Sequence, residues 1–257
     1  MSSDPADYYQ RGLSFLSEKP PNLIKALSLI RKAKLLFDQN GNDRESEAAQ
    51  DKIFYVYMSI VEKEYNQAKN LLTIASYEKS LAKAIDAFSH LEKSHPKYTQ
   101  KTSRKIQNLI EQIGIELLYD VERNQNKTSL SESLSKLHYV ERIMLDVFYP
   151  QLKPFGDSAE LPDNFIQEIQ DRRKIQRAFI NLYESLGNLA KKHGKEYIQA
   201  GNITQGASSI DLAKKLYHAA NFSQKIKDLE PTYQKIYEAQ GDLAYTYAET
   251  LVEDNRL

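Results

Sequence analysis

The chain has 257 residues, of which 41% are hydrophobic and 27% are charged, a balance typical of globular proteins and not of disordered chains. Its 35 basic and 35 acidic side chains give a formal net charge of zero, so bulk charge favours neither nucleic acid nor an anionic membrane as a partner. Because the chain has no cysteine, disulfides, thiolate metal sites and cysteine nucleophiles are excluded.

No stretch approaches the roughly 18 consecutive apolar residues of a membrane span, so we expect a soluble chain without membrane insertion. Residues 1–5 are polar and lack the charged-then-apolar pattern of a signal peptide. The compartment stays open. The cytoplasm is slightly favoured, and an exported form whose signal has been removed is the alternative.

Apolar residues recur at steps of three and four through most of the chain, which is the period of an amphipathic helix. Polar residues, prolines and glycines interrupt this period at 19–22, 40–42, near 76, 95–96, 124–126, 149–163, 201–202, 221 and 230–231. These interruptions predict an all-α protein of about ten helices. Two of the helices, at 44–73 and 164–200, are expected to be unusually long.

Helix start signals agree with these boundaries. Asp4 precedes Pro5, Ser129 and Glu132 have the spacing of a capping box, and Glu230-Pro231 is suited to open the last helix. The turns between most helices are short, so consecutive helices are expected to pair as hairpins.

Residues 149–163 carry three prolines and a glycine and exceed the usual connection of 2 to 8 residues between helices. We therefore expect an N-terminal helical-hairpin region at 1–149, a linker or crossover at 150–162, and a C-terminal helical region with a capping helix at 163–257. The linker is interpreted as a surface crossover, and the alternative is a mobile loop whose Phe155 contacts a partner.

Small and large residues alternate through 194–213. The small residues are Gly194, Gly206 and Ala213, and the large ones include Tyr197 and Ile210. Two helices that cross closely need small side chains at the crossing and large ones in the adjoining holes. This run predicts a tight helical hairpin, although Gly187 also fits the first helix one heptad earlier.

Partial versions of the same pattern occur at 8–33, 71–96 and 231–244. Together the four places, covering about half the chain, resemble tetratricopeptide repeats. The resemblance implies a right-handed solenoid of helical hairpins whose first helices line a concave groove for an extended peptide or a partner helix. The helix at 231–244 lacks a following partner and is expected to cap the stack.

Catalytic and metal-binding patterns are weak. The five histidines fall on different predicted segments or at segment ends, and Glu92 and His95 give one Glu-x-x-His spacing without a second copy. The turn at 201–206 lacks the lysine and the preceding strand of a phosphate-binding loop. We therefore predict no catalytic residue, no metal site, no cofactor and no enzymatic activity.

Three basic clusters, at 97–105, 172–177 and 191–195, are mostly interpreted as solvated helix faces. The third is the favoured partner-binding site, because Lys191 and Lys195 lie near Tyr197 on the helix that the resemblance places toward the groove. Such a site would hold a carboxylate. Other tyrosines fall at helical packing positions and are expected in the core: Tyr8, Tyr57, Tyr65, Tyr119, Tyr183 and Tyr237.

The sequence thus favours a non-enzymatic adaptor or assembly scaffold that binds a protein or peptide in a groove. The alternative is a structural subunit of a permanent complex or a homo-oligomer, with the long helices at 44–73 and 164–200 as its lateral interface.

Overall fold

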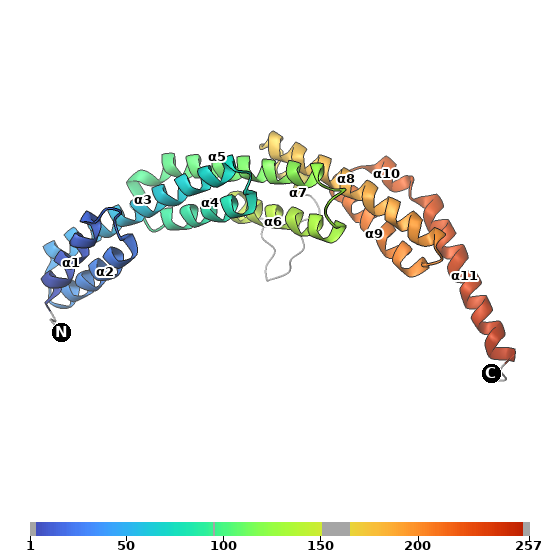
Figure 1. Cartoon of the computed structure of the whole chain (residues 1–257), viewed down its shortest axis with the longest axis horizontal. Coiled ribbons are helices and arrows are strands. Elements are labelled where there is room, and N and C mark those ends of the chain that lie inside the picture. The colour runs from blue at the N-terminus through green and yellow to red at the C-terminus, as the bar shows by residue number, and fades with distance from the viewer. Residues whose placement is uncertain (1–3, 95, 151–164, 254–257) are drawn as a thin grey trace. The chain divides into compact units, whose positions relative to one another are not determined.

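The computed structural model describes residues 4–94, 96–150 and 165–253, with the backbone alone given for 96–98 and 251–253. Every regular element in these ranges is a helix, which confirms the all-α prediction (Figure 1). The helices are α1 (Pro5–Ser17), α2 (Leu23–Gln39), α3 (Asp43–Thr73), α4 (Tyr77–Leu91), α5 (Pro96–Arg123), α6 (Leu130–Phe148), α7 (Phe165–Glu168), α8 (Arg173–Gln199), α9 (Ile203–Ala219), α10 (Ser223–Lys227) and α11 (Glu230–Glu253).

Contacts divide the chain into two compact units, residues 1–114 and 115–257, and the boundary falls inside α5. The linker expected at 150–162 falls almost entirely on residues 151–164, which lie outside the described ranges. A division of the chain at that linker therefore stays a prediction.

In the first unit, α1 packs on α2, α2 on α3, and α3 on α4 (Figure 1). The core of this unit alternates small and large buried side chains, among them Ala26, Ile30, Ala33, Ile53, Val56 and Tyr57. Helix α3 runs for 31 residues without a glycine or a proline, which confirms the long helix expected at 44–73. Its length lets it contact both α2 and α4.

In the second unit, α8 packs on α6, α7 and α9, while α9 also contacts α10 and α11. The largest fully buried side chains of this unit include Leu137, Met144, Phe179 and Tyr217. Helix α11 joins this core only through its first turns, where Thr232 and Ile236 are buried. Residues 240–250 are all exposed.

The prediction of a single long helix at 164–200 is wrong in one respect, because the helix is broken between α7 and α8. The backbone N–H of Arg172 donates to the Ile169 carbonyl at 3.0 Å and closes a turn there. The Tyr149 hydroxyl donates to the carboxylate of Asp171 within the same turn. No glycine or proline lies between Phe165 and Arg173, so the break depends on tertiary contacts that the local sequence does not display.

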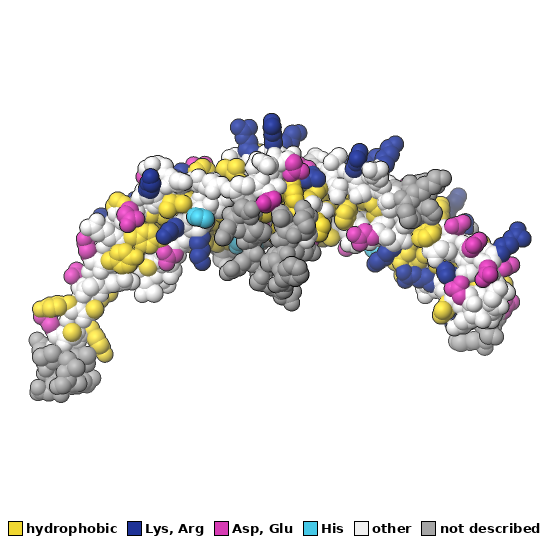
Figure 2. All heavy atoms as spheres, turned by 180° about the vertical axis from the view of Figure 1, so that it is seen from behind, with side chains coloured by type: hydrophobic (Ala, Val, Ile, Leu, Met, Phe, Trp, Pro, Cys, Tyr) yellow, Lys and Arg dark blue, Asp and Glu magenta, His cyan; other side chains and the backbone are white. Residues whose placement is uncertain are grey.

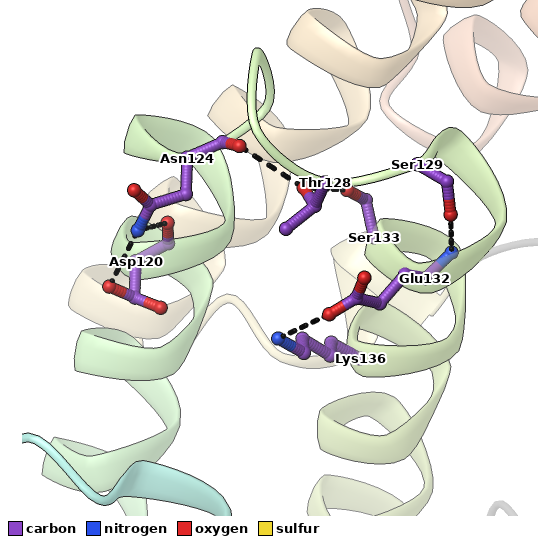
Figure 3. Close-up of polar contacts among 7 residues, drawn as sticks. All are labelled: Asp120, Asn124, Thr128, Ser129, Glu132, Ser133 and Lys136. Atoms are coloured by element: carbon purple, nitrogen blue, oxygen red, sulfur yellow. Dashed lines mark hydrogen bonds and ion pairs between the residues drawn. The ribbon is translucent and has the colours of Figure 1, made fainter.

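The turn between α5 and α6 is held by side-chain caps (Figure 3). The Asn124 amide donates to the Asp120 carboxylate at 2.9 Å and to the Asp120 carbonyl at 3.0 Å, which closes the end of α5. Ser129 Oγ accepts the backbone N–H of Glu132 at 3.1 Å, which confirms Ser129 as the start signal of α6. The Glu132 carboxylate pairs with Lys136 at 3.1 Å.

Across the described ranges, no helix combines the length and the apolar character that crossing a bilayer requires.

Candidate functional site

The hairpin of α8 and α9 carries the candidate site, and two glycines set its geometry. A Cβ added to Gly194 would lie 2.7 Å from Cδ1 of Ile210 and 3.1 Å from the carbonyl oxygen of Gly206. A Cβ added to Gly206 would lie 2.6 Å from Cγ1 of Ile198 and 3.1 Å from the carbonyl oxygen of Gly194. The two helices therefore cross with their backbones in direct contact, as the small residues predicted.

Gly187, one heptad earlier on α8, also lies against α9. A Cβ there would lie 2.6 Å from the ring of Tyr217, which is buried. The sequence offered Gly187 and Gly194 as alternative contact points on the first helix. Both glycines contact α9 in the same hairpin. The contact extends over at least two turns of α8, which makes the hairpin a stiff platform.

A polar cluster fixes α10 against this hairpin. Lys225 pairs with Glu184 at 2.8 Å, and both Lys225 and the Tyr217 hydroxyl donate to Oδ1 of Asn188, at 3.1 and 2.8 Å. Burial, followed by the nearby charges of Glu184 and Asp228, raises the pKa of Tyr217 to about 12. The phenol therefore stays protonated at neutral pH and keeps donating its hydrogen bond.

The three residues predicted to bind a partner all lie in the last turns of α8. Lys195 is exposed, Lys191 is half-buried, and Tyr197 is 40% exposed. Lys191 and Lys195 are four residues apart and share one face of the helix.

Tyr197 lies on a different side of α8 from the two lysines. A helix turns about 100° per residue, so Tyr197 is rotated by roughly 160° from Lys195 and roughly 120° from Lys191. Tyr197 instead follows Ala190 and Gly194 at helical spacing, on the side that packs toward α9. A ligand that touches all three residues must wrap around the end of the helix.

The electrostatics of the lysine pair favour an anionic ligand. Neither Lys191 nor Lys195 forms an ion pair with any residue that the structure describes. The neighbouring Lys192 lies 3.9 Å from the carboxylate of Glu196, its own i,i+4 partner. Two cations one turn apart, without a counter-ion among the described residues, can hold a carboxylate between them.

A buried carboxylate between α6 and α8 was not foreseen from the sequence. Glu141 is 1% exposed, accepts a hydrogen bond from the Tyr183 hydroxyl, and lies 2.7 Å from Nδ1 of His138. The burial of Glu141 could have been predicted from its spacing, because it lies four residues after Leu137 and three before Met144, which are both buried. These contacts satisfy the carboxylate from within the protein, so we interpret it as structural.

The expectation that tyrosines pack in the core holds for some and fails for one. Tyr57 and Tyr183 are buried, whereas Tyr8, Tyr65 and Tyr119 are half-buried. Tyr237 is 67% exposed, so its assignment to the core is wrong. Helix α11 has no following helix among the described residues to cover it.

Exposed large apolar side chains occur on α11 and α2, where the sequence did not predict an exposed apolar surface. Tyr237, Leu243, Tyr245 and Tyr247 are exposed on α11, and Ile24 and Leu35 are exposed on α2. Helix α11 lies at the left end of Figure 2. The outer face of a helix gives no sequence signal of its own unless the neighbouring helices are known.

No group of three or more histidine, aspartate and glutamate side chains suited to a metal ion occurs among the described residues. His95, which completes the Glu-x-x-His spacing, lies outside them.

No protein-family model, no curated protein and no solved structure matches this chain.

Proposed function

We propose that this protein is a non-enzymatic adaptor or assembly scaffold whose α8–α9 hairpin captures an acidic peptide or partner helix. The proposal includes a tetratricopeptide-like solenoid arrangement of the hairpins. Within each unit, the consecutive packing of α1 to α4 and of α8, α9 and α11 supports it.

The observation that carries the proposal is the lysine pair on a stiff platform. Lys191 and Lys195 project from a helix whose backbone is held against α9 at Gly194 and Gly206. A ligand that binds there does not have to order the helix first, which lowers the entropic cost of binding. The lysines select for carboxylates, and the exposed part of Tyr197 offers apolar contact to a ligand that continues around the helix end.

Lys195 is exposed and Lys191 is only half-buried, so each ion pair with a ligand contributes only about 0.2–1 kcal/mol. Affinity must therefore come from several such contacts together with apolar burial. This predicts a ligand with at least two acidic side chains at helical or extended spacing, and not a single free carboxylate.

A peptide selection tests the charge preference directly. Sixteen-residue peptides from a random display library would be selected against the full chain, and the affinities of the enriched peptides measured by fluorescence anisotropy. We expect the enriched peptides to be acidic and to bind a Lys191→Glu/Lys195→Glu variant at least tenfold more weakly, a change of about 1.4 kcal/mol.

The matched control is Lys101→Glu/Lys105→Glu, which reverses an exposed lysine pair of the same i,i+4 spacing on α5. This control should bind the enriched peptides as the wild type does. Enriched peptides without an excess of acid, or equal binding by both double variants, would contradict the proposal.

A further inference from the structure

The outer part of α11 combines an acidic net charge with exposed large apolar side chains. Residues 236–250 contain three acidic side chains and no basic one. Four large apolar side chains in this stretch, Tyr237, Leu243, Tyr245 and Tyr247, are 60–67% exposed. At about 150–250 Å² for each aromatic ring, these side chains leave several hundred Å² of apolar surface in water, divided over two sides of the helix.

The helical period separates this surface into two sides. Leu243 and Tyr247 continue the line of Ile236, which is buried against α9. Tyr237 and Tyr245 lie on another face, which they share with three small residues, Gly241, Ala244 and Ala248. The acidic side chains Glu238, Asp242 and Glu249 run along the edge of that face, which we name the α11 face.

Two other helical glycines, Gly12 and Gly194, show which kind of side chain packs over a glycine on a helix of this chain. A Cβ on Gly12 would lie 2.6 Å from Ile30 of α2, and a Cβ on Gly194 would lie 2.7 Å from Ile210 of α9. In each case a bulky side chain of a neighbouring helix fills the space over the glycine. Nothing lies within 4 Å of a Cβ built on Gly241. The α11 face therefore has the small-residue surface of a helix crossing without a helix on it.

The outer face of α2 has the complementary chemistry. Residues 23–37 contain four basic side chains and no acidic one. Ile24 is 70% exposed and Leu35 is 56% exposed, and they lie on one face with Ser28 between them.

The charges of α2 are mostly not neutralised within the chain. Lys25 lies 5.4 Å from the ring centroid of Phe15, Lys32 donates to the Tyr8 hydroxyl at 2.8 Å, and Arg31 donates to the Tyr57 hydroxyl. These partners are neutral. Lys34 alone among the four pairs with a described carboxylate, that of Asp38 at 2.7 Å. On α11, Glu238, Asp242 and Glu249 likewise form no ion pair with a described residue.

We propose that the α11 face of one copy docks across the outer face of α2 of a second copy. Ile24 or Leu35 would fill the space over Gly241 and Ala244, and the acidic edge of α11 would face Lys25 and Lys32. Pairing of α11 with α11 would bring two acidic edges together and is disfavoured. The contact joins different surfaces of identical chains, so it propagates into rings or filaments. It uses neither Lys191, Lys195 nor Tyr197, and it stands or falls independently of the proposed function.

Site-directed cross-linking tests the pairing, because the chain has no cysteine of its own. Ala248→Cys places a thiol on the α11 face, and Ser28→Cys places one between Ile24 and Leu35. When equal amounts of the two full-length variants are mixed and oxidised, we expect the mixed disulfide to exceed both self-linked species at least tenfold. Thr246→Cys, on the opposite side of α11, is the matched control and should link to Ser28→Cys no faster than colliding monomers do.

Charge exchange gives a second readout, in sedimentation equilibrium at low salt. Glu238→Lys/Asp242→Lys and Lys25→Glu/Lys32→Glu should each weaken self-association at least tenfold, and a mixture of the two variants should associate again. All these positions are exposed, and circular dichroism checks that the variants fold. A chain that stays monomeric up to about 100 μM, an Ala248→Cys variant that links mainly to itself, or an absence of rescue in the mixture would each overturn the proposal.

Discussion

Glu141 is the one acidic or basic residue that is buried in the described ranges. It is a carboxylate at 1% exposure, held by the Tyr183 hydroxyl and by His138. An ionised carboxylate is tolerated at such a depth when its oxygens are hydrogen-bonded or paired. Burial, and then the charge of Glu141, raise the pKa of Tyr183 well above its usual value, so this phenol remains a donor at neutral pH.

The pairing with Glu141 makes the stability of the second unit depend on pH through His138. Its hydrogen bond to Glu141 raises the pKa of His138 above the usual 6.5, against an opposing effect of burial. A group whose pKa is higher in the folded state adds stability below its unfolded pKa and loses that contribution as pH rises through the folded value.

We therefore expect His138→Gln to lower the free energy of unfolding more at pH 6 than at pH 8. The His138 side chain is 64% exposed, so the difference should be modest, about 0.5–1 kcal/mol. Urea unfolding at the two pH values measures it. An equal loss at both would show that the charged pair does not form.

Replacing a helical glycine by alanine should have opposite effects on stability at Gly194 of α8 and at Gly241 of α11. Gly194→Ala would bring a Cβ within 2.7 Å of Ile210 and 3.1 Å of a backbone oxygen, so we expect a loss of about 1–3 kcal/mol in unfolding free energy. Gly241→Ala meets open space and should gain about 0.5–1 kcal/mol from helix propensity. Thermal unfolding of both variants at high salt, where self-association is screened, compares them. Equal effects would contradict the close crossing of α8 and α9.

The side chain of Ser129 caps the start of α6 with one hydrogen bond. The spacing of Ser129 and Glu132 predicted a capping box, and the Ser129 half of it is present at 3.1 Å. The Glu132 side chain instead turns along the helix to Lys136 (Figure 3).

Replacing Ser129 by Ala should therefore cost about 0.5–2 kcal/mol, whereas Glu132→Gln should change the free energy of unfolding by less than about 0.5 kcal/mol. Urea unfolding followed by circular dichroism separates the two variants. A cost as large for Glu132→Gln as for Ser129→Ala would show that a complete capping box forms in solution.

Helix boundaries could be predicted where the cause is local. Gly41 and Gly201 adopt φ of 70° and 78° at the ends of α2 and α8, and the sequence marked both as breaks. The break between α7 and α8 could not be predicted in this way. It involves Tyr149, which is 22 residues away from Asp171 along the chain.

Part of the candidate site could be predicted from residue spacing alone. The i,i+4 interval of Lys191 and Lys195 correctly places them on one face, and the small residues around Gly194 correctly indicate the crossing with α9. The grouping of Tyr197 with them overlooked the helical rotation between positions 195 and 197. The apolar side chains of α11 could not be recognised as exposed, since that depends on which helices lie beside it.

Affinity co-purification from native extract asks whether Lys191 and Lys195 of the α8–α9 hairpin capture a partner, as we propose. Wild type, Lys191→Glu/Lys195→Glu and Lys101→Glu/Lys105→Glu would be compared side by side, with circular dichroism confirming that each is folded. We expect one partner that wild type and the α5 control retain and that the α8 variant loses. A partner retained equally by all three proteins, or none captured by wild type, would contradict this proposal.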